Sequence, residues 1–455
     1  MYLRDTIAAI STPLGEGGIS IIRISGPDCL SIADRIFRRS RDGGLKSHRF
    51  YYGVIFDPDS AAILDEAMVV LMRGPNSFTR EDVLELHCHG GYLVVRRILA
   101  LVLRQGARLA DPGEFTKRAF LNGRIDLVQA EAIMDIIRSK SEMSLNLAQH
   151  QREGLLSRQL LQLKEYLLSS LAFLEAFIDF PEEDIDVSAK EHIGQNIDSS
   201  LLMLDELLSG FSEGRIIREG VSVVIAGKPN VGKSSLLNAL LQEKRAIVTA
   251  IPGTTRDLIE EQMTIKGLPV KLLDTAGIRE SDDHVEKEGV KLSLEKLSSA
   301  DLVLFVVDAS SPFSAEDQSI LERLSGFSFM VVKNKSDIDG SYVLPFEPEL
   351  PVLSLSTHTG HGLVDLQQAI FDFFIHHPGH DSREFVAISQ VRHRDALTGC
   401  RNALANFKDN LDREVNLDLL AIDLRDALDS LGAVTGETTA DDVLDRIFQQ
   451  FCIGK

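Results

Sequence analysis

The chain contains a glycine-rich segment, residues 227–234, whose residue types suit the binding of nucleotide phosphates. It reads Gly-Lys-Pro-Asn-Val-Gly-Lys-Ser, and its glycines allow backbone N–H groups to wrap a phosphate chain. Lys233 can reach the β- and γ-phosphates, and the Ser234 hydroxyl can bind Mg²⁺. An apolar run, residues 221–226, precedes the segment, and a helical pattern follows it. Because a phosphate-binding loop requires this strand–turn–helix context, we favour that interpretation over a chance glycine-rich turn.

Two later motifs have the spacing of the Mg²⁺ and γ-phosphate contacts of a nucleotide hydrolase. Residues 270–277 begin with a strand pattern that ends in Asp274, and they finish at Gly277. The Asp274 carboxylate can hold Mg²⁺ through water, and the Gly277 N–H can meet the γ-phosphate. Residues 253–257, Gly-Thr-Thr-Arg-Asp, lie between the loop and this strand. A switch threonine in that position binds Mg²⁺ only when the γ-phosphate is present.

The nucleotide base is indicated by residues 331–337, a strand that runs into Asn-Lys-Ser-Asp. The Asp337 carboxylate can accept hydrogen bonds from both the N1–H and the amino group of guanine. Adenine cannot donate this pair and would leave the carboxylate unpaired. Residues 354–357, Ser-Leu-Ser-Thr, are expected to close the base pocket. The ordered set of motifs therefore predicts a GTPase domain.

The segment after Gly277 lacks the glutamine that orients the attacking water in small GTPases. Ile278 stands at that position, and an apolar side chain cannot orient water. Asp282, Asp283 and Glu286 follow and can polarise water, although a solvated acidic loop explains each of them as well.

Asn230 is the second unusual residue of the nucleotide motifs. Its side-chain oxygen can coordinate a monovalent cation near the phosphates, which would supply positive charge where other GTPases use an arginine. The alternative is that Asn230 only braces the loop through a hydrogen bond.

The composition describes a large, acidic chain. Its 455 residues suggest about three domains, and 48 Lys+Arg against 68 Asp+Glu leave a net charge of −20. This charge opposes general polyanion binding, so any contact with nucleic acid must come from a local basic surface. The best candidate is residues 35–49, RIFRRSRDGGLKSHR, for which a solvated basic loop is an equally good explanation.

Cysteine usage and hydropathy indicate the compartment. The four cysteines are scattered without C-x-x-C spacing, which is typical of reduced thiols: Cys29, Cys88, Cys400 and Cys452. The N-terminus has no basic segment followed by an apolar stretch, and no apolar run is long enough to span a bilayer. We therefore expect a cytoplasmic protein without membrane association.

The chemical groups must be positioned by elements of more than one kind of domain. Residues 1–120 are mixed α/β, with strands expected over 18–25, 67–72 and 82–88, helices over 28–38 and 93–104, and a turn at 111–114 that opens a short helix. Residues 121–214 and 380–455 carry helical patterns and flank a GTPase domain at 215–379. Their helices are expected over residues 125–150, 155–180, 190–211, 391–411, 417–431 and 441–451.

The predicted fold class is therefore multidomain, α/β and all-α. An N-terminal α/β domain precedes a discontinuous helical domain, into which a Ras-like P-loop GTPase domain is inserted. Thr439 and Asp442 have the spacing of a capping box at the last helix. The sequence has no second phosphate loop and no internal repeat, which excludes GTPases with two such domains.

Several motifs together resemble one known family. They are GKPNVGKSS, IPGTTRD and DTAGIR in the GTPase domain, LELHCHGG at residues 84–91, FTKRAFLNGR at residues 115–124, and the terminal FCIGK. Over its whole length the chain resembles the MnmE (TrmE) family of tRNA uridine-modification GTPases. Many relatives share the GTPase motifs, whereas the N-terminal segments and the terminal Cys-Ile-Gly-Lys single out this family.

The resemblance implies a function beyond GTP hydrolysis. The N-terminal domain would bind a tetrahydrofolate derivative, 5-formyl- or 5,10-methylene-tetrahydrofolate, and form a constitutive homodimer. With the FAD-dependent MnmG protein, in a heterotetramer-type complex, the family installs an aminomethyl-type (carboxymethylaminomethyl) group at C5 of the wobble uridine of certain tRNAs. Its GTPase is K⁺-dependent and is activated by dimerisation of the GTPase domains.

The resemblance also implies roles for residues of the GTPase domain. Glu286 matches the catalytic acidic residue. Mg²⁺ would be bound by Ser234 and Thr255, and K⁺ by Asn230, Thr249, Ile251 and Thr254. GTP contacts are expected from Asn230, Val231, Gly232, Lys233, Ser234, Ser235, Thr249, Ala250, Ile251, Pro252, Gly253, Thr254, Thr255, Asp274, Thr275, Ala276, Gly277, Asn334, Lys335, Ser336, Asp337, Ser356, Thr357 and His358.

For the folate, the resemblance implies contacts from Arg23, Glu85, Arg124 and Lys455, with Arg124 standing where relatives can carry lysine. Cationic groups suit the folate glutamate, and a carboxylate suits the pterin donors. Cys452 matches the family's motif cysteine and is a candidate for chemistry, with a structural thiol as the alternative. His87 and His89 lie on one strand face, but no third ligand is evident and no metal site is expected there.

Two other functions remain open. A ribosome-assembly GTPase would share the nucleotide motifs, associate with rRNA and bind no folate. A structural scaffold would use its GTPase only to set its conformation.

Overall fold

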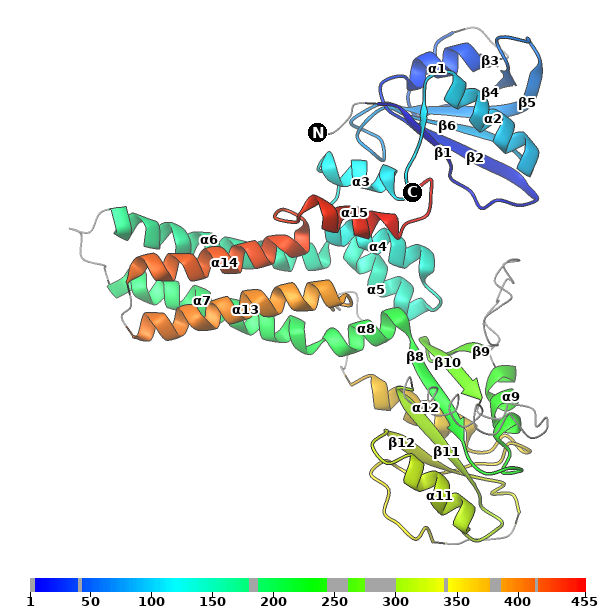
Figure 1. Cartoon of the computed structure of the whole chain (residues 1–455), viewed down its shortest axis with the longest axis vertical. Coiled ribbons are helices and arrows are strands. Elements are labelled where there is room, and N and C mark those ends of the chain that lie inside the picture. Colours follow the sequence, from blue (N-terminus) through cyan, green and yellow to red (C-terminus); the bar gives the residue numbers. More distant parts are fainter. Residues whose placement is uncertain are drawn as a thin grey trace, which may run out of the picture. The chain divides into compact units, whose positions relative to one another are not determined.

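The computed structural model describes residues 5–39, 43–179, 187–243, 261–274, 300–338, 343–376, 386–413 and 416–455 (Figure 1). The chain forms two compact units. The first unit comprises Met1–Met134, Gln151–Leu201 and Gly399–Lys455, and the second comprises Asp135–His150 and Leu202–Thr398. Within the described residues, no helix is both long and apolar enough to cross a membrane.

The first unit contains a seven-stranded sheet in the order β3-β4-β5-β6-β2-β1-β7. The strands are β1 (Ile7–Ile10), β2 (Gly17–Ser25), β3 (Phe37–Arg39), β4 (Phe50–Phe56), β5 (Ile63–Met72), β6 (Val83–Gly90) and β7 (Arg108–Leu109). Helices α1 (Cys29–Ile36) and α2 (Tyr92–Arg104) bury apolar stripes against one face of the sheet. The other face leaves Phe50 and Tyr52 exposed. The turn and short helix predicted after residue 111 are confirmed as α3 (Glu114–Leu121).

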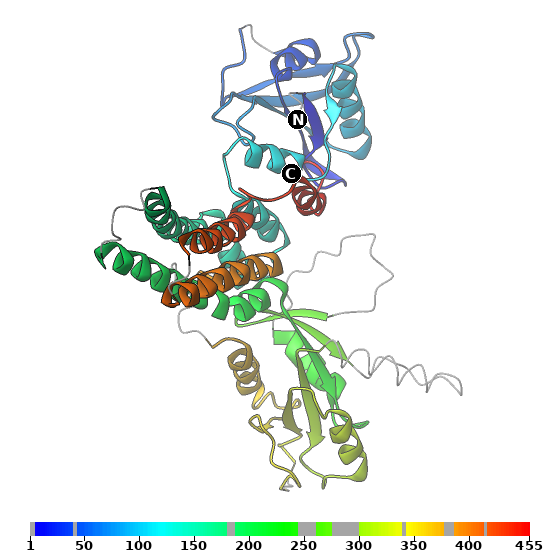
Figure 2. The same ribbon diagram turned by 60° about the vertical axis from the view of Figure 1, so that its left-hand side comes forward.

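Helices make up the rest of the first unit and part of the second. They are α4 (Leu127–Arg138), α5 (Glu142–Arg152), α6 (Leu155–Asp179), α7 (Val187–Ser209), α8 (Phe211–Glu219), α13 (Val391–Asp412), α14 (Leu417–Thr435) and α15 (Asp441–Gln449). Figures 1 and 2 both show α6 beside α14. The helical segment predicted over residues 125–150 consists of two helices, because Ser141 and Ser144 bond each other's backbone N–H and start α5 as a new helix.

The capping box predicted at the last helix is wrong. Helix α15 has Ala440 at its N-cap and no side-chain cap. The helix begins one residue later than the pattern implies, and the Thr439 hydroxyl donates instead to the Ala433 carbonyl at 3.2 Å. A tertiary hydrogen bond to the preceding helix has therefore displaced the local one.

The second unit contains a six-stranded sheet in the order β13-β12-β11-β8-β10-β9. Its strands are β8 (Val221–Ala226), β9 (Glu261–Ile265), β10 (Leu268–Asp274), β11 (Leu302–Asp308), β12 (Phe329–Asn334) and β13 (Leu353–Ser354). All pair in parallel except β9, which is antiparallel to β10. Helices α9 (Lys233–Glu243), α11 (Ala315–Arg323) and α12 (Leu363–Phe374) accompany the sheet. Its central strands β8 and β11 are mostly apolar, as is typical of strands buried on both faces.

The predicted fold class is confirmed, with an N-terminal α/β part, helices on both sides in sequence, and a P-loop-type α/β part between them. The boundaries predicted at residues 120, 214 and 379 stay predictions. Residues Asp135–His150 group with the second unit, where Met143 and Leu147 share a core with strand β8. As predicted, the four cysteines are free. Desolvation raises the pKa of the buried Cys29 thiol to about 12.

Candidate functional site

The nucleotide motifs gather at one edge of the second sheet. Strands β8, β10, β11 and β12 are parallel, and their registers place Asp274 beside Ile225 and Asp308 beside Asn334. The loop after β8 and the Asn-Lys-Ser-Asp segment after β12 therefore leave the sheet from the same side. Ligands of open α/β sheets bind at the carboxyl ends of the strands.

The loop between β8 and α9 has a backbone that its glycines make possible. Gly232 has φ of 98°, and a Cβ there would lie 2.2 Å from the Asn334 side-chain nitrogen. A Cβ on Gly227 would lie 2.4 Å from the Val306 carbonyl oxygen. Asn230 has φ of 64°, a left-handed conformation that asparagine tolerates better than most residues. Its side chain is exposed.

The cationic and hydroxyl groups of the motif lie where the loop turns into helix α9. The Lys233 Nζ donates to the carbonyls of Gly227 at 2.9 Å and Lys228 at 2.8 Å, so its ammonium lies across the loop. Ser234 and Ser235 are exposed in the first turn of α9. The N–H groups of a first helical turn lack intrahelical acceptors and favour an anion.

Asn334 joins the loop to the base-binding segment. Its side chain is fully buried, and its Nδ2 donates to the Val231 carbonyl at 2.8 Å. Its Oδ1 accepts from the Thr357 N–H at 3.1 Å. One amide therefore fixes the phosphate loop and the segment after β13 relative to each other.

An open hollow lies beside the Asn-Lys-Ser-Asp segment. Its lining residues are Ser336, Asp337, Ser354, Thr359, Gly360 and His361. Asp337 is exposed, and a hydrogen bond from the Ser356 side chain holds the pKa of its carboxyl below the usual range. The Ser356 Oγ also accepts from the N–H groups of His358 and Thr359. The carboxylate is thus ionised and ready to accept hydrogen bonds.

Two ion pairs support the site, and the sequence did not reveal either of them. Lys335 pairs with Asp308 at 2.6 Å, and Lys228 pairs with the buried Asp317 at 2.8 Å. Burial acts to raise the pKa of Asp317, but the hydrogen bonds from Lys228 and Ser314 hold it below its usual range. Ser314 and Asp317 form a capping box at α11, and their spacing is visible in the sequence. The contact between Asp317 and Lys228 of the loop could not be read from the sequence.

Many predicted GTP contacts lie outside the described residues. These are Thr249, Ala250, Ile251, Pro252, Gly253, Thr254, Thr255, Thr275, Ala276 and Gly277, together with the candidate catalytic Glu286 and its neighbours Asp282 and Asp283. Asp274 is described only by its backbone, at the end of β10.

Three of the predicted folate residues, Arg23, Glu85 and Arg124, come together in the first unit. Arg23 on β2 faces Glu85 on β6, and the Arg23 Nε donates to the Glu85 Oε1 at 2.9 Å. The Nε2 of His87 lies 3.2 Å from the other carboxylate oxygen. The hydrogen bond with His87 and the charge of Arg23 hold the pKa of Glu85 below its usual range, against the opposing effect of burial.

Phe78, which the sequence did not single out, and Phe115 of the FTKRAFLNGR motif complete this cluster. The Arg23 guanidinium lies 5.6 Å from the ring centre of Phe78 and 5.9 Å from that of Phe115. Arg124 lies 5.0 Å from the Phe78 ring centre and donates to the Ser77 carbonyl at 3.0 Å. Phe78 is in a loop, so no periodicity could have identified it.

The C-terminal tail runs against the same sheet. Gly454 has φ of 92°, and a Cβ there would lie 2.4 Å from the Ile10 carbonyl oxygen. The Ser11 hydroxyl donates to the Gly454 carbonyl at 3.2 Å. Ile10 pairs with Ile22, next to Arg23, so the structure brings Lys455 to the strand beside this cluster. Cys452 is exposed, and its carbonyl accepts from the Gly113 N–H.

The histidines of β6 have carboxylate partners instead of a metal arrangement. His89 Nδ1 lies 2.7 Å from the Asp65 carboxylate, which raises the pKa of the histidine through that hydrogen bond. In the part of the chain that the structure describes, no group of three His, Cys, Asp or Glu residues is placed to hold a metal ion.

Comparison with known proteins shows similarity over the full length. A family model described as the GTP-binding protein TrmE N-terminus matches residues 6–124, and one described as the MnmE helical domain matches residues 127–452. The tRNA modification GTPase MnmE of Geotalea uraniireducens is 69% identical over 455 residues, covering 100% of both chains. The proteins of that name from Geobacter metallireducens and Natranaerobius thermophilus are 60% identical over 457 residues and 46% identical over 456 residues, covering 100% and 99% of each chain.

Proposed function

Because the chain belongs to the MnmE family of tRNA modification GTPases, and is thus a GTP hydrolase acting in tRNA modification, we propose that it helps to install a carboxymethylaminomethyl-type group at C5 of the wobble uridine. An FAD-dependent protein of the MnmG type would be its partner, and a tetrahydrofolate derivative would supply the one-carbon unit. The observation that carries the GTPase part is the buried Asn334 amide, which joins a phosphate loop to a guanine-type Asn-Lys-Ser-Asp segment.

The proposed roles at the nucleotide follow from the placement of the groups. Lys233 and the loop N–H groups hold the β- and γ-phosphates, and Asp337 accepts from guanine. The exposed Ser234 hydroxyl, on the first turn of α9, suits a Mg²⁺ ligand, with Thr255 as its proposed switch partner. When bound, Mg²⁺ neutralises charge on the two phosphates. Glu286 is proposed to orient the attacking water, which the apolar Ile278 cannot do.

Asn230 is proposed to bind K⁺ together with Thr249, Ile251 and Thr254. Asn230 is exposed and occupies a left-handed position of the loop. Because K⁺ loses water more readily than Na⁺, we expect GTP hydrolysis to be faster in KCl than in NaCl at equal ionic strength. Since a well-placed arginine accelerates related hydrolysis by about 10³–10⁵, a cation in its place should give roughly tenfold or more.

The measurement is the steady-state hydrolysis rate in the two salts. Asn230→Ala should remove the difference while leaving GTP affinity nearly unchanged. The exposed Asn406 on α13 provides the control, and Asn406→Ala should retain the preference for K⁺. Equal wild-type rates in KCl and NaCl would show that Asn230 only braces the loop.

The cluster around Arg23 fits a tetrahydrofolate. The ionised Glu85, which is paired with Arg23, suits the pterin N–H donors, and the Arg124 guanidinium suits the glutamate carboxylates. The Phe78 ring between the two arginines offers an apolar surface for the flat parts of the ligand. Lys455 is proposed to reach the ligand from the C-terminal tail, with Cys452 as a candidate for chemistry nearby. The bound folate would supply a one-carbon unit.

We also propose how the protein assembles and in which compartment it works. The exposed apolar side chains on the open face of the first sheet, such as Phe50 and Tyr52, suit a homodimer formed through this part of the chain. Dimerisation of the GTPase domains would accompany hydrolysis. We propose that the protein works in the cytoplasm, where its four cysteines would stay reduced.

The function is tested by reconstitution with an MnmG-type protein, tRNA, GTP and 5-formyl- or 5,10-methylene-tetrahydrofolate, with mass spectrometry of the wobble uridine. Wild-type chain should give the modified nucleoside. Arg23→Ala should keep GTP hydrolysis but bind folate roughly 10-fold to 100-fold more weakly, since a charge-assisted hydrogen bond contributes about 1.5–3 kcal/mol. Deletion of the last two residues should weaken folate binding less.

A matched control for Arg23 is Arg97→Ala, an exposed arginine of α2, which should behave as wild type. Calorimetry with each folate identifies the bound derivative. A chain that hydrolyses GTP, binds no folate and associates with rRNA would be a ribosome-assembly GTPase, contrary to the proposal.

A further inference from the structure

The edge of the first sheet carries a cluster of basic side chains that the proposed function does not use. It consists of Arg39 at the end of strand β3, Lys46 and Arg49 in the following loop, and Arg73 after β5, and we call it the basic edge. We propose that the basic edge binds the phosphate backbone of the RNA substrate. This inference rests on the proposed function, which makes a tRNA the substrate.

The loop of the basic edge is built into the sheet. Leu45 is buried in the core, and the His48 N–H donates to the Leu71 carbonyl at 2.8 Å. The Ser47 Oγ accepts from the Arg73 N–H at 3.0 Å. These bonds place Lys46, Arg49 and Arg73 on one short stretch of surface. Their positions are therefore set by the fold, which lowers the entropy lost when they bind a ligand.

Tyr51 on strand β4 connects Arg39 to the loop. The Arg39 guanidinium stacks over the Tyr51 ring, 4.1 Å from its centre. The Tyr51 hydroxyl accepts from the Lys46 N–H at 3.0 Å. One aromatic side chain thus holds two cationic residues side by side. Stacking on the ring fixes the position of the Arg39 guanidinium beside the loop that carries Lys46.

Three other arginines of the first unit are neutralised by carboxylates. Arg23 pairs with Glu85, Arg104 with Asp57, and Arg108 with Glu114. Among the described residues, none of the four cations of the basic edge forms an ion pair, and the Arg39 Nη1 is buried without a hydrogen-bond partner. The exposed Lys46, Arg49 and Arg73 therefore keep charge that an incoming anion can neutralise.

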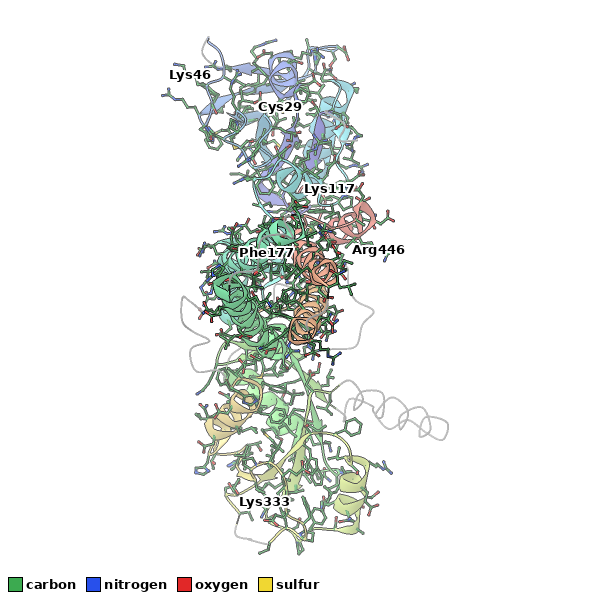
Figure 3. The ribbon with its side chains drawn as sticks, turned by 90° about the vertical axis from the view of Figure 1, so that its left-hand side faces the viewer. Cys29, Lys46, Lys117, Phe177, Lys333 and Arg446 are labelled. Carbon is green, nitrogen blue, oxygen red and sulfur yellow. The ribbon has the colours of Figure 1, made fainter. Side chains whose placement is uncertain are left out.

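The negative charge of the whole chain restricts its contact with nucleic acid to local basic surfaces such as the basic edge. At a net charge of −20 the chain repels a polyanion in general, so binding depends on local surfaces with unneutralised cations. Lysine and arginine contacts to phosphates supply affinity without reading sequence. Figure 3 shows Lys46 at the outer margin of the N-terminal sheet, with its side chain directed away from it. A long, continuous phosphate backbone fits such an exposed edge.

The test measures the affinity of full-length chain for fluorescent tRNA by anisotropy between 50 and 300 mM KCl (about the range in which salt competes with phosphate contacts). The double substitution Lys46→Glu/Arg49→Glu should weaken binding by roughly tenfold to a hundredfold at the lowest salt. The slope of log affinity against log salt should decrease by about 1.5, since each lost phosphate contact contributes about 0.7–0.9.

The control is Lys190→Glu/Arg323→Glu, which changes two exposed cations elsewhere by the same net charge and should retain wild-type affinity and slope. The neutral Lys46→Gln/Arg49→Gln should lie between wild type and the reversal, and a thermal melt verifies that each variant is folded. Unchanged affinity and slope in the charge reversal would overturn the inference and leave this edge to an acidic protein partner. Absence of tRNA binding by the wild type would instead refute the proposed function.

Discussion

Replacing Asn334 with alanine is expected to weaken GTP binding by about 100-fold to 1,000-fold. The Asn334 amide is fully buried and bonds the Val231 carbonyl of the phosphate loop and the Thr357 N–H. The substitution leaves both of these groups without their partner, at a cost of roughly 1–3 kcal/mol each. It also opens a cavity beside Gly232, whose Cα lies against this amide. The phosphate and base contacts then lose their common support.

The measurement is the dissociation constant of a fluorescent GDP and a fluorescent GTP analogue. Both should weaken by a similar factor, because Asn334 supports the site without touching the γ-phosphate. Asn410→Ala is the matched control, since its amide donates to Asp423 at 2.9 Å in the first unit and the loss removes the same kind of bond. An Asn334→Ala protein with wild-type affinity would contradict the supporting role.

The phosphate loop could be predicted from sequence because its determinants are local. Strand, glycine turn and helix follow one another between residues 221 and 243, and each carries its own pattern. The hydrogen bond from Asn334 to Val231 joins residues 103 positions apart, and no spacing in the sequence encodes it. The same holds for Lys228 and Asp317, whose pairing depends on where α11 packs.

In the first unit, the sequence indicated strands but not their order. Arg23 and Glu85 were expected near one ligand by resemblance, whereas their ion pair follows from the pairing of β2 with β6. Strand β4 was not predicted, although its Phe50–Phe56 run is aromatic and β-branched. The basic segment 35–49 left two explanations open, and only the fold shows which of its cations lie together around Tyr51.

Glu286→Ala is expected to lower the rate of GTP hydrolysis by about 10²–10⁴, the usual contribution of a group that orients or deprotonates the attacking nucleophile. Ile278 occupies the position of the usual glutamine and offers no polar atom to a water molecule. Glu286 lies outside the described residues, and the role proposed for it rests on its match to the family's acidic residue. Because a water-orienting group contributes only once GTP is bound, GTP affinity should change by less than about threefold.

The experiment combines single-turnover hydrolysis in KCl with a binding titration for each variant. Glu286→Gln distinguishes two roles, since an amide can still orient water but cannot accept a proton. If Glu286→Gln loses only part of the hydrolysis rate, Glu286 orients the water. If it loses as much as Glu286→Ala, Glu286 accepts a proton or acts through its charge. Glu316→Ala, an exposed glutamate of α11, is the matched control and should hydrolyse GTP at the wild-type rate. Near-normal hydrolysis by Glu286→Ala would contradict the assignment and direct it to Asp282 or Asp283.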